Sequence, residues 1–330
     1  MTILKTDKLK SYYILDTLGK KQYVKAVDGV EMEIKENEIY GIAGESGCGK
    51  TTLIKTLFGM VEPPLTIMEG TVYYKINEKF INIFSLEKKD MRKIRWEYIS
   101  YIPQGSMSVL NPVTKIIHSF EDFLKAHKKI KSKEEIRKPV EEHLMALGLP
   151  TKVLDSYPHQ LSGGMRQRVT VALATIMQPK IIIADEPTTA LDVVMQRGVI
   201  QLLKDIQSKQ KNTIIIVTHD MGIHANVADR IGIMYAGKII EEADTLEIFE
   251  NPLHPYTKYL IGSLPQIGDK SYRISAPGTP PSLMNPPKGC RFYPRCERAM
   301  KECIEKIPKL IEIRPNHKVA CFLYSEEMEE

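Results

Sequence analysis

The sequence lacks any apolar run of the length that a membrane-spanning helix needs. No stretch of its 330 residues approaches the roughly 18 consecutive apolar side chains of such a helix. The start, MTILKTDKLKSYY, also lacks the apolar core of a signal peptide. We therefore expect a cytoplasmic chain, and its 43% hydrophobic residues are enough for a full-sized core.

The sequence also has a small net charge and few cysteines. The 46 basic and 41 acidic residues leave a net charge of only +5, which does not indicate nucleic-acid binding, although an anionic membrane surface would not repel the chain. The five cysteines do not suggest a disulfide framework, since cytoplasmic thiols stay reduced. Three of them fall within GCRFYPRCERAMKEC, residues 289–303, and this grouping indicates a metal site.

A glycine-rich turn between an apolar strand and a helix is the strongest signal. The stretch IYGIAGESGCGKTTLIKTLFGM, residues 39–60, contains GxxxxGK[ST] from Gly44 to Thr51. Glycines let backbone N–H groups wrap phosphates, and the helix N-terminus adds positive potential. Lys50 would then bridge the β and γ phosphates, and Thr51 would bind Mg²⁺. The alternative is a turn without ligand, which the flanking strand and helix disfavour.

Two adjacent carboxylates end a second apolar strand. In PKIIIADEPTTALD, residues 179–192, the predicted strand Ile181–Ala184 leads into Asp185 and Glu186. Asp185 would hold Mg²⁺ through its water shell, and Glu186 would orient or deprotonate the attacking water. Without the phosphate loop, a pair that merely caps the following turn would be the simpler interpretation.

A second anion-facing turn lies between these motifs. LSGGMRQR, residues 161–168, places Ser162 and two glycines before an amphipathic helix. This stretch resembles the signature motif of ATP-binding cassette (ABC) ATPases. The resemblance implies an α/β P-loop NTPase core with an antiparallel β subdomain and a helical subdomain. It also implies that ATP is sandwiched in a head-to-tail dimer, where the signature of one subunit closes on the phosphate loop of the other.

The resemblance assigns roles to further residues in chain order. Gln104, which ends the predicted strand in YIPQ, is similar to the glutamine that touches Mg²⁺ and water. Asp192 belongs to the D-loop ALD, and His219, which ends the predicted strand in IIIVTHD, matches the switch histidine. Catalytic roles thus go to Glu186, His219 and Gln104, and magnesium binding to Thr51, Gln104 and Asp185. The expected ATP-binding residues are Tyr23, Gly44, Ser46, Gly47, Cys48, Gly49, Lys50, Thr51, Thr52, Ser162, Gly163, Gly164, Gln167 and Asp192.

The remaining segments differ from these motifs in composition. Residues from about 105 to 160 are charged and helical by period, with a lysine-rich stretch, 125–138, that is either a solvated face or an approach to lipid head groups. We place the ABC ATPase domain at 1–250 and a loop-rich, proline-rich extension at 251–330. Within it, NPLHPYTKYLIGSLP and GTPPSL resemble the C-terminal extension of oligopeptide and dipeptide importer ATPases, and LSGGMRQRVTVALA resembles their D-type subunit. One departure is Asn37, where the family usually has glycine; asparagine also tolerates a left-handed turn.

The four distal cysteines have the spacing Cx5Cx6Cx17C. Cys290, Cys296, Cys303 and Cys321 lack the close-paired knuckles usual for structural zinc. Wider spacing suits a [4Fe–4S] cluster, which the resemblance also implies; zinc and free buried thiols stay open. If Cys296 and Cys303 shared one straight helix their Cα atoms would be about 10 Å apart, so we expect either that the chain bends or that the two side chains lean together.

These features together predict the ATP-hydrolysing subunit of an importer of di- or oligopeptides, or of related solutes such as nickel or oligosaccharides. The resemblance implies a paralogous ATPase subunit, two transmembrane permease subunits and an external solute-binding protein as partners, no nucleic acid, and a peripheral position on the cytoplasmic face of the membrane. The alternative is a soluble ABC ATPase that acts on ribosomes or nucleic acid. It is disfavoured because the translation-linked family with iron–sulfur clusters has two cassettes and an N-terminal cluster domain.

Overall fold

The computed structural model describes residues 1–17, 19–105, 109–127, 133–264 and 276–324, and the chain forms two compact units. Unit 1 takes in Met1–Ser85 and Val217–Glu330, and unit 2 takes in Leu86–Ile216. The expected domain boundary at residue 250 stays a prediction, since residues on both of its sides belong to unit 1. No helix in the described ranges combines the length and apolarity that a membrane span requires.

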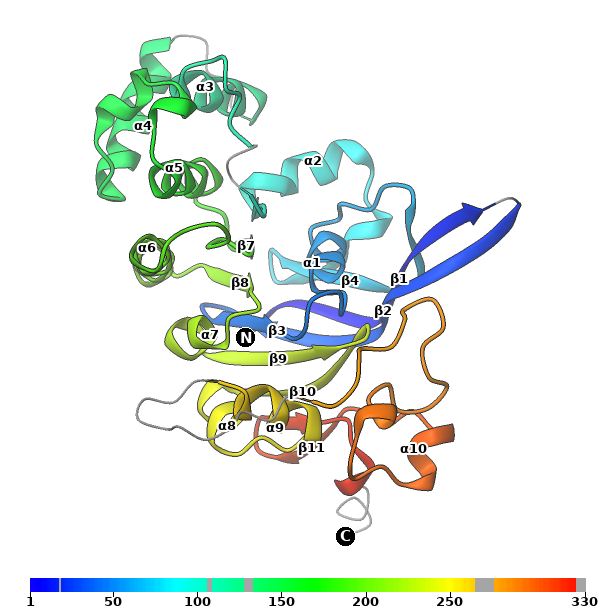
Figure 1. The fold of residues 1–330 in the computed structure, drawn as a ribbon. Coiled ribbons are helices and arrows are strands. Elements are labelled where there is room, and N and C mark those ends of the chain that lie inside the picture. The colour runs from blue at the N-terminus through cyan, green and yellow to red at the C-terminus, as the bar shows by residue number, and fades with distance from the viewer. Residues whose placement is uncertain (18, 106–108, 128–132, 265–275, 325–330) are drawn as a thin grey trace. The chain divides into compact units, whose positions relative to one another are not determined.

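Unit 1 contains an antiparallel sheet and a mixed one. The first has the order β2-β1-β4-β5, and Figure 1 shows β1 and β2 as its long blue hairpin. The second runs β11-β12-β10-β9-β3 within this unit, with β3 and β9 parallel and the other pairs antiparallel. The strands are β1 (Thr2–Thr17), β2 (Lys20–Lys35), β3 (Ile39–Ala43), β4 (Leu65–Ile76), β5 (Lys79–Asn82), β9 (Arg230–Tyr235), β10 (Lys238–Asp244), β11 (Ile311–Arg314) and β12 (His317–Val319).

Unit 1 also has an interior strand, β3, and several short helices. Every residue of β3 is buried, as expected for a parallel strand that is covered on both faces. The turn before β3 contains Asn37 with φ 60°, so the left-handed conformation expected at this position is confirmed. The helices are α1 (Lys50–Leu57), η1 (Ile83–Ser85), α7 (Met221–Val227), α8 (Thr245–Glu250), α9 (Pro255–Gly262), η5 (Tyr293–Arg295) and α10 (Lys301–Glu305).

Unit 2 pairs a short sheet with most of the longer helices. Its strands are β6 (Ile99–Ile102), β7 (Ile181–Asp185) and β8 (Thr213–Val217), with β6 and β7 parallel; the last residue of β8 is assigned to unit 1. Its helices are α2 (Lys88–Glu97), α3 (Ile116–His127), α4 (Lys133–Ala146), η3 (Thr151–Asp155), η4 (Pro158–Gln160), α5 (Gly163–Thr175) and α6 (Val193–Gln210). The predicted helical segment thus has α3 and α4 at its centre, and together the two units confirm the α/β class.

The predicted lysine-rich stretch is only partly covered by the structure. Residues 128–132 lie outside the described residues. Lys125, at its start, forms an ion pair of 3.3 Å with Glu121 one helical turn earlier, and its side chain is 44% exposed. This residue fits the solvated-face interpretation.

The C-terminal extension packs onto unit 1 through aromatic rings and a strand. Phe292 is 1% exposed and its ring lies 5.3 Å from that of Tyr235 and 5.5 Å from that of Tyr256. Strand β12 adds to β10, with Val319 opposite Glu241. Residues 265–275 lie outside the described residues. Although rich in loops as expected, the extension shares the core of unit 1 and has little core of its own.

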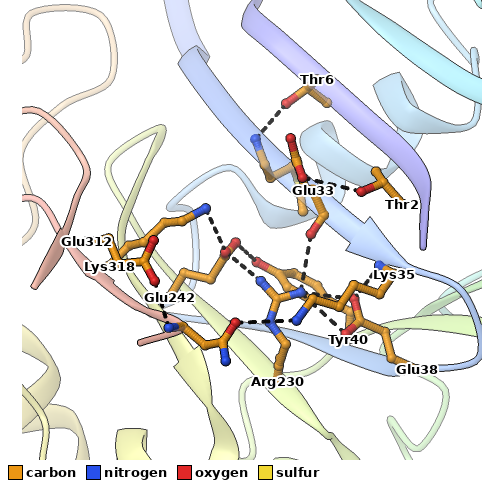
Figure 2. A network of polar contacts seen from close by, with 12 residues as sticks. Thr2, Thr6, Glu33, Lys35, Glu38, Tyr40, Arg230, Glu242, Glu312 and Lys318 are labelled. Carbon is orange, nitrogen blue, oxygen red and sulfur yellow. Dashed lines mark hydrogen bonds and ion pairs between the residues drawn. The ribbon is translucent and has the colours of Figure 1, made fainter. Parts of the chain in front are cut away.

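A buried ionic network joins β3 to its neighbours (Figure 2). Arg230, at the start of β9, donates to Glu38 over 3.1 Å and to Glu242 of β10 over 2.6 Å. The hydroxyl of Tyr40 in β3 donates to the same Glu242 over 2.6 Å. Lys318 of β12 approaches this carboxylate to 3.6 Å. The strand that leads into the glycine-rich turn is therefore fixed by charge as well as by packing.

Candidate functional site

The glycine-rich turn has the backbone that its sequence predicts. It connects β3 to α1, and Gly44, Gly47 and Gly49 have φ of 149°, 78° and 110°. A Cβ atom on Gly44 would lie 2.1 Å from the carbonyl oxygen of Met234, and one on Gly49 would lie 2.0 Å from that of Ala26. Glycine is required at both positions because neighbouring backbone leaves no space for a side chain.

Lys50 closes over this turn. Its ammonium donates to the carbonyl oxygens of Gly44 over 2.7 Å and of Glu45 over 2.9 Å, and the residue is 6% exposed. Phosphate oxygens could replace these carbonyls as acceptors while the lysine stays in place. Cys48 is buried in the same turn, and burial raises the pKa of its thiol, so it is a small uncharged side chain there.

The two predicted carboxylates stand at the end of β7 in unit 2. Asp185 is 1% exposed and accepts a hydrogen bond from the Tyr101 hydroxyl over 2.8 Å. Burial, and then the charge of Asp185, raise the pKa of Tyr101, which keeps this hydroxyl a donor. Tyr101 therefore orients the Asp185 carboxylate in an interior position.

Glu186 is held by two donors within unit 2. Its Oε2 accepts from the Gln104 amide over 3.0 Å and from the Thr189 hydroxyl over 2.8 Å. Gln104 lies two residues beyond the end of β6, so the expected strand is shorter than the sequence suggested. The backbone of Glu186 has φ 43°, an uncommon conformation for a non-glycine residue that often marks a functional site. The structure thus brings two of the predicted catalytic residues into contact.

The signature turn forms a helix N-terminus, as predicted. The Ser162 hydroxyl caps α5 by accepting from the backbone N–H of Met165 over 3.3 Å. At Gly164 a Cβ atom would lie 2.6 Å from Sδ of Met195, so a side chain there would displace this methionine. Asp192 caps α6 by accepting from the backbone N–H of Met195 over 2.9 Å. Gln167 is 3% exposed, and its amide nitrogen has no partner among the described residues.

His219 and Tyr23 are exposed residues of unit 1. His219 lies two residues beyond the end of β8, so this strand also ends earlier than the sequence suggested. The following Asp220 caps α7 through the backbone N–H of Gly222 over 2.8 Å. Tyr23 is 39% exposed in β2, opposite Ile14. The assigned nucleotide contacts of His219 and Tyr23 stay predictions.

Known proteins match this chain along nearly its whole length. The dipeptide transport ATP-binding protein DppD of Caldanaerobacter subterraneus is 42% identical over 326 residues, which cover 98% of each chain. The chain belongs to the ABC transporter ATP-binding proteins. AppD of Bacillus subtilis, an oligopeptide transport ATP-binding protein, is 40% identical over 99% of this chain and 98% of its own. The ABC transporter family matches residues 27–189, and the oligopeptide/dipeptide transporter C-terminal region matches residues 240–303.

Solved ABC cassettes have the same fold. The ATP-binding cassette MJ0796, dimeric and bound to ADP and Pi, superposes with a TM-score of 0.62 at 30% identity over 74% of this chain and 99% of its own. CbiO1 of Clostridium perfringens, part of the ABC transporter complex CbiONQ, gives 0.62 at 28% identity over 76% and 91%. The predicted P-loop NTPase class is confirmed, and the chain is an ABC-type ATPase.

The four distal cysteines of this ABC ATPase are free thiols in unit 1. Cys296 ends η5 whereas Cys303 lies in α10, so of the two expected arrangements the bend is present. The backbone N–H of Cys290 donates to the carbonyl of Cys303 over 2.8 Å. Burial, with smaller contributions from the neighbouring thiols, raises the pKa of Cys290 and of Cys321 to about 11. Within the described ranges, no three His, Cys, Asp or Glu side chains form a group that could hold a metal ion.

Sequence reasoning missed the residues that attach the extension to the phosphate loop. The carboxylate of Glu45 forms an ion pair of 2.8 Å with Arg295, and its backbone N–H donates to the Tyr256 hydroxyl over 2.9 Å. Arg291 pairs with Asp28 of β2. Each of the two arginines stands next to a cysteine in GCRFYPRC, and this pattern was the available signal.

Proposed function

We propose that this ABC ATPase powers the import of dipeptides or oligopeptides. The observation that carries the proposal is that the match continues through residues 240–303, a region described for oligopeptide and dipeptide transporters. The proteins most similar to the whole chain include DppD and AppD, which supports the D-type assignment. The solute itself is contacted by other subunits of such importers, so nickel and oligosaccharides stay alternatives.

We propose the predicted division of roles for ATP. Backbone N–H groups from Gly44 to Thr52, with Lys50, bind the phosphates, and Tyr23 stacks on adenine. The nearly fully buried Asp185 fits a hard cation, and Thr51 and Gln104 supply further oxygen donors of the kind that Mg²⁺ prefers. Mg²⁺ would supply positive charge beside the phosphates when bound.

Glu186 acts as the base in this proposal. Its carboxylate accepts from Gln104 and Thr189, which hold it in one orientation, and we assign to it the proton of the attacking water. Gln104 thereby orients Glu186 as well as the water. His219 contributes a hydrogen bond to the γ phosphate.

The signature residues serve a second cassette. These residues lie in or beside the first turns of two capped helices, a geometry that suits an anion brought by another molecule. They are Ser162, Gly163, Gly164, Gln167 and Asp192. We infer a head-to-tail dimer with a paralogous ATPase subunit, and the dimeric state of MJ0796 supports it. Two permease subunits and an external solute-binding protein would complete the importer, with this chain peripheral on the cytoplasmic face of the membrane.

An iron–sulfur cluster is proposed at the four thiols of Cys290, Cys296, Cys303 and Cys321. A tetrahedral zinc with Zn–S bonds of about 2.3 Å would draw its sulfurs to about 3.8 Å from one another. No three ligands among the described residues are grouped closely enough to hold a metal ion, and the thiols lie near enough to raise each other's pKa. A larger core spaces its thiolates more widely. Partly buried Tyr293 and Phe322 and buried Phe292 would shield it from water.

The catalytic role of Glu186 is tested by Glu186→Gln in the assembled importer. The amide keeps the shape and removes the base, so ATP should still bind while turnover falls by about 10²-fold or more. Glu142→Gln, on an exposed position of α4 in the same unit, is the matched control and should hydrolyse ATP at the parental rate. Hydrolysis by Glu186→Gln at a near-parental rate would remove this residue from the catalytic role.

A further inference from the structure

A negatively charged side chain sits inside the phosphate loop. Glu45 occupies one of the four positions that the GxxxxGK[ST] pattern leaves open, and phosphate groups are anionic. A carboxylate at this position would repel them unless its charge is cancelled. In unit 1 both of its oxygens accept from Arg295, over 2.8 and 3.1 Å.

Arg295 is fixed so that its guanidinium faces Glu45. Its remaining donors bond to the carbonyl oxygens of Pro277 over 2.7 Å and Ala276 over 3.2 Å, and to the Tyr235 hydroxyl over 3.2 Å. The residue is 6% exposed, and its guanidinium lies 5.8 Å from the ring centres of Tyr235 and Phe292. The pairing is bidentate, the geometry in which an Arg–carboxylate contact is strongest, with the arginine buried and the Glu45 side chain 30% exposed.

A second arginine of the same stretch reaches the loop through one turn. Arg291 donates to the carbonyl oxygen of Ala236 over 2.6 Å. The next residue, Gly237, donates its backbone N–H to the carbonyl of Cys48 over 2.8 Å. The extension therefore holds the phosphate loop near both of its ends, and of these two contacts the one at Glu45 carries charge directly into the loop.

We propose that Arg295 is a positioning residue for ATP, which draws the carboxylate of Glu45 onto the C-terminal extension and cancels its charge. The extension thereby sets nucleotide affinity, in addition to its packing role. The inference rests on the proposed binding of phosphate by residues 44–51. It makes the ion pair a requirement for tight ATP binding and leaves the hydrolysis step to other residues.

The test measures the Kd of a fluorescent ATP analogue for the full chain at two salt concentrations. Arg295→Gln leaves Glu45 uncompensated and should weaken binding about tenfold at low salt, less at high salt, and less for AMP than for ATP. In the assembled importer KM should rise while kcat changes little. Glu45→Gln added to Arg295→Gln should restore affinity to within about threefold of the parent.

Three further variants distinguish an error in the role of Arg295 from an error in the proposed phosphate site. Arg295→Lys keeps the charge and should retain most of the affinity, whereas Arg298→Gln, an exposed arginine three residues on, is the matched control and should change nothing. Lys50→Ala tests the phosphate loop itself: retained ATP binding there would overturn the proposed site.

The inference is overturned if Lys50→Ala loses ATP and Arg295→Gln does not. It is also overturned if the loss in Arg295→Gln is independent of salt and is not restored by Glu45→Gln, because that pattern would assign the arginine to packing alone. If Arg295→Gln fails to fold, Glu45→Gln alone decides: a tenfold loss of affinity in that variant contradicts the inference, and parental or tighter binding supports it.

Discussion

Replacing Arg230 by methionine should destabilise unit 1 selectively. The arginine side chain is 8% exposed and is the cation between Glu38, which is equally buried, and Glu242, whose side chain is 1% exposed (Figure 2). Methionine fills a similar volume but leaves both carboxylates in the interior without this charge. Breaking a buried pair from one side costs about 3–5 kcal/mol, and here two carboxylates share the lost partner. We expect a loss at the upper end of that range.

The loss should depend on pH in a direction that the structure sets. Burial raises the pKa of Glu38, and Arg230 opposes that rise. Without the arginine the folded-state pKa rises further above the unfolded value, so the folded protein binds a proton more readily than the unfolded chain. The variant should therefore regain stability as the pH falls from 8 towards 5, and lose it as the pH rises through the raised pKa.

Hydrogen exchange of peptides from β3 and β9 measures this directly. A loss of about 3–5 kcal/mol corresponds to exchange about 150- to 5,000-fold faster. Trp96, the single tryptophan, lies in unit 2, and its fluorescence reports whether that unit stays folded. Arg314→Met, which removes an exposed pair with Glu247 at 3.8 Å, is the matched control in unit 1. A loss below about 1 kcal/mol in Arg230→Met would refute the reasoning.

Two more predictions concern the extension. Burial lowers the pKa of His254 to about 4, and its Nδ1 accepts from the backbone N–H of Tyr256 at the start of α9, so the free energy of unfolding should decline as the pH falls from about 6.5 to 4. His254→Asn, a cap that does not titrate, should flatten this decline in denaturation curves, and an unchanged pH profile would contradict the prediction. Anaerobically purified protein should be brown and contain about four irons per chain. The variant Cys303→Ser should lose this metal, and limited proteolysis should cleave it faster within residues 276–324 than within residues 1–85. Stoichiometric zinc would contradict the iron assignment, and an unchanged digestion pattern in a metal-free protein would contradict a stabilising metal site of any kind.

The parts of the site that depend on neighbouring residues could be predicted from the sequence. The turn from Gly44 to Lys50 and the cap at Ser162 follow from local backbone requirements, because glycine and serine are selected there by conformations that few residues adopt. The left-handed Asn37 follows for the same reason. The ends of the strands were predicted less accurately, because β6 and β8 each end two residues before the polar side chain that marks their motif.

Contacts between distant residues needed the structure. Gln104 and Glu186 are 82 positions apart, and only the family resemblance suggested that both act on one water. Arg295 and Glu45 are 250 positions apart, and neither periodicity nor motif spacing links them. The proline-rich extension offered no hydrophobic period from which its docking could be inferred, because it packs through single aromatic rings and arginines rather than through an amphipathic face.

The position of Glu45 explains why such an extension would be retained with its cassette. The phosphate-loop pattern fixes the glycines, the lysine and the hydroxyl, and it leaves residue 45 free to vary. An acidic residue there lowers phosphate affinity in any chain that cannot neutralise it, so glutamate at 45 and arginine at 295 are useful only together. Because the arginine is held by Pro277, Ala276 and Tyr235, its charge reaches the loop only when residues 276–296 are folded against unit 1. Folding of the cysteine-bearing segment and affinity for ATP are thereby linked through one ion pair, and a change in either must change the other.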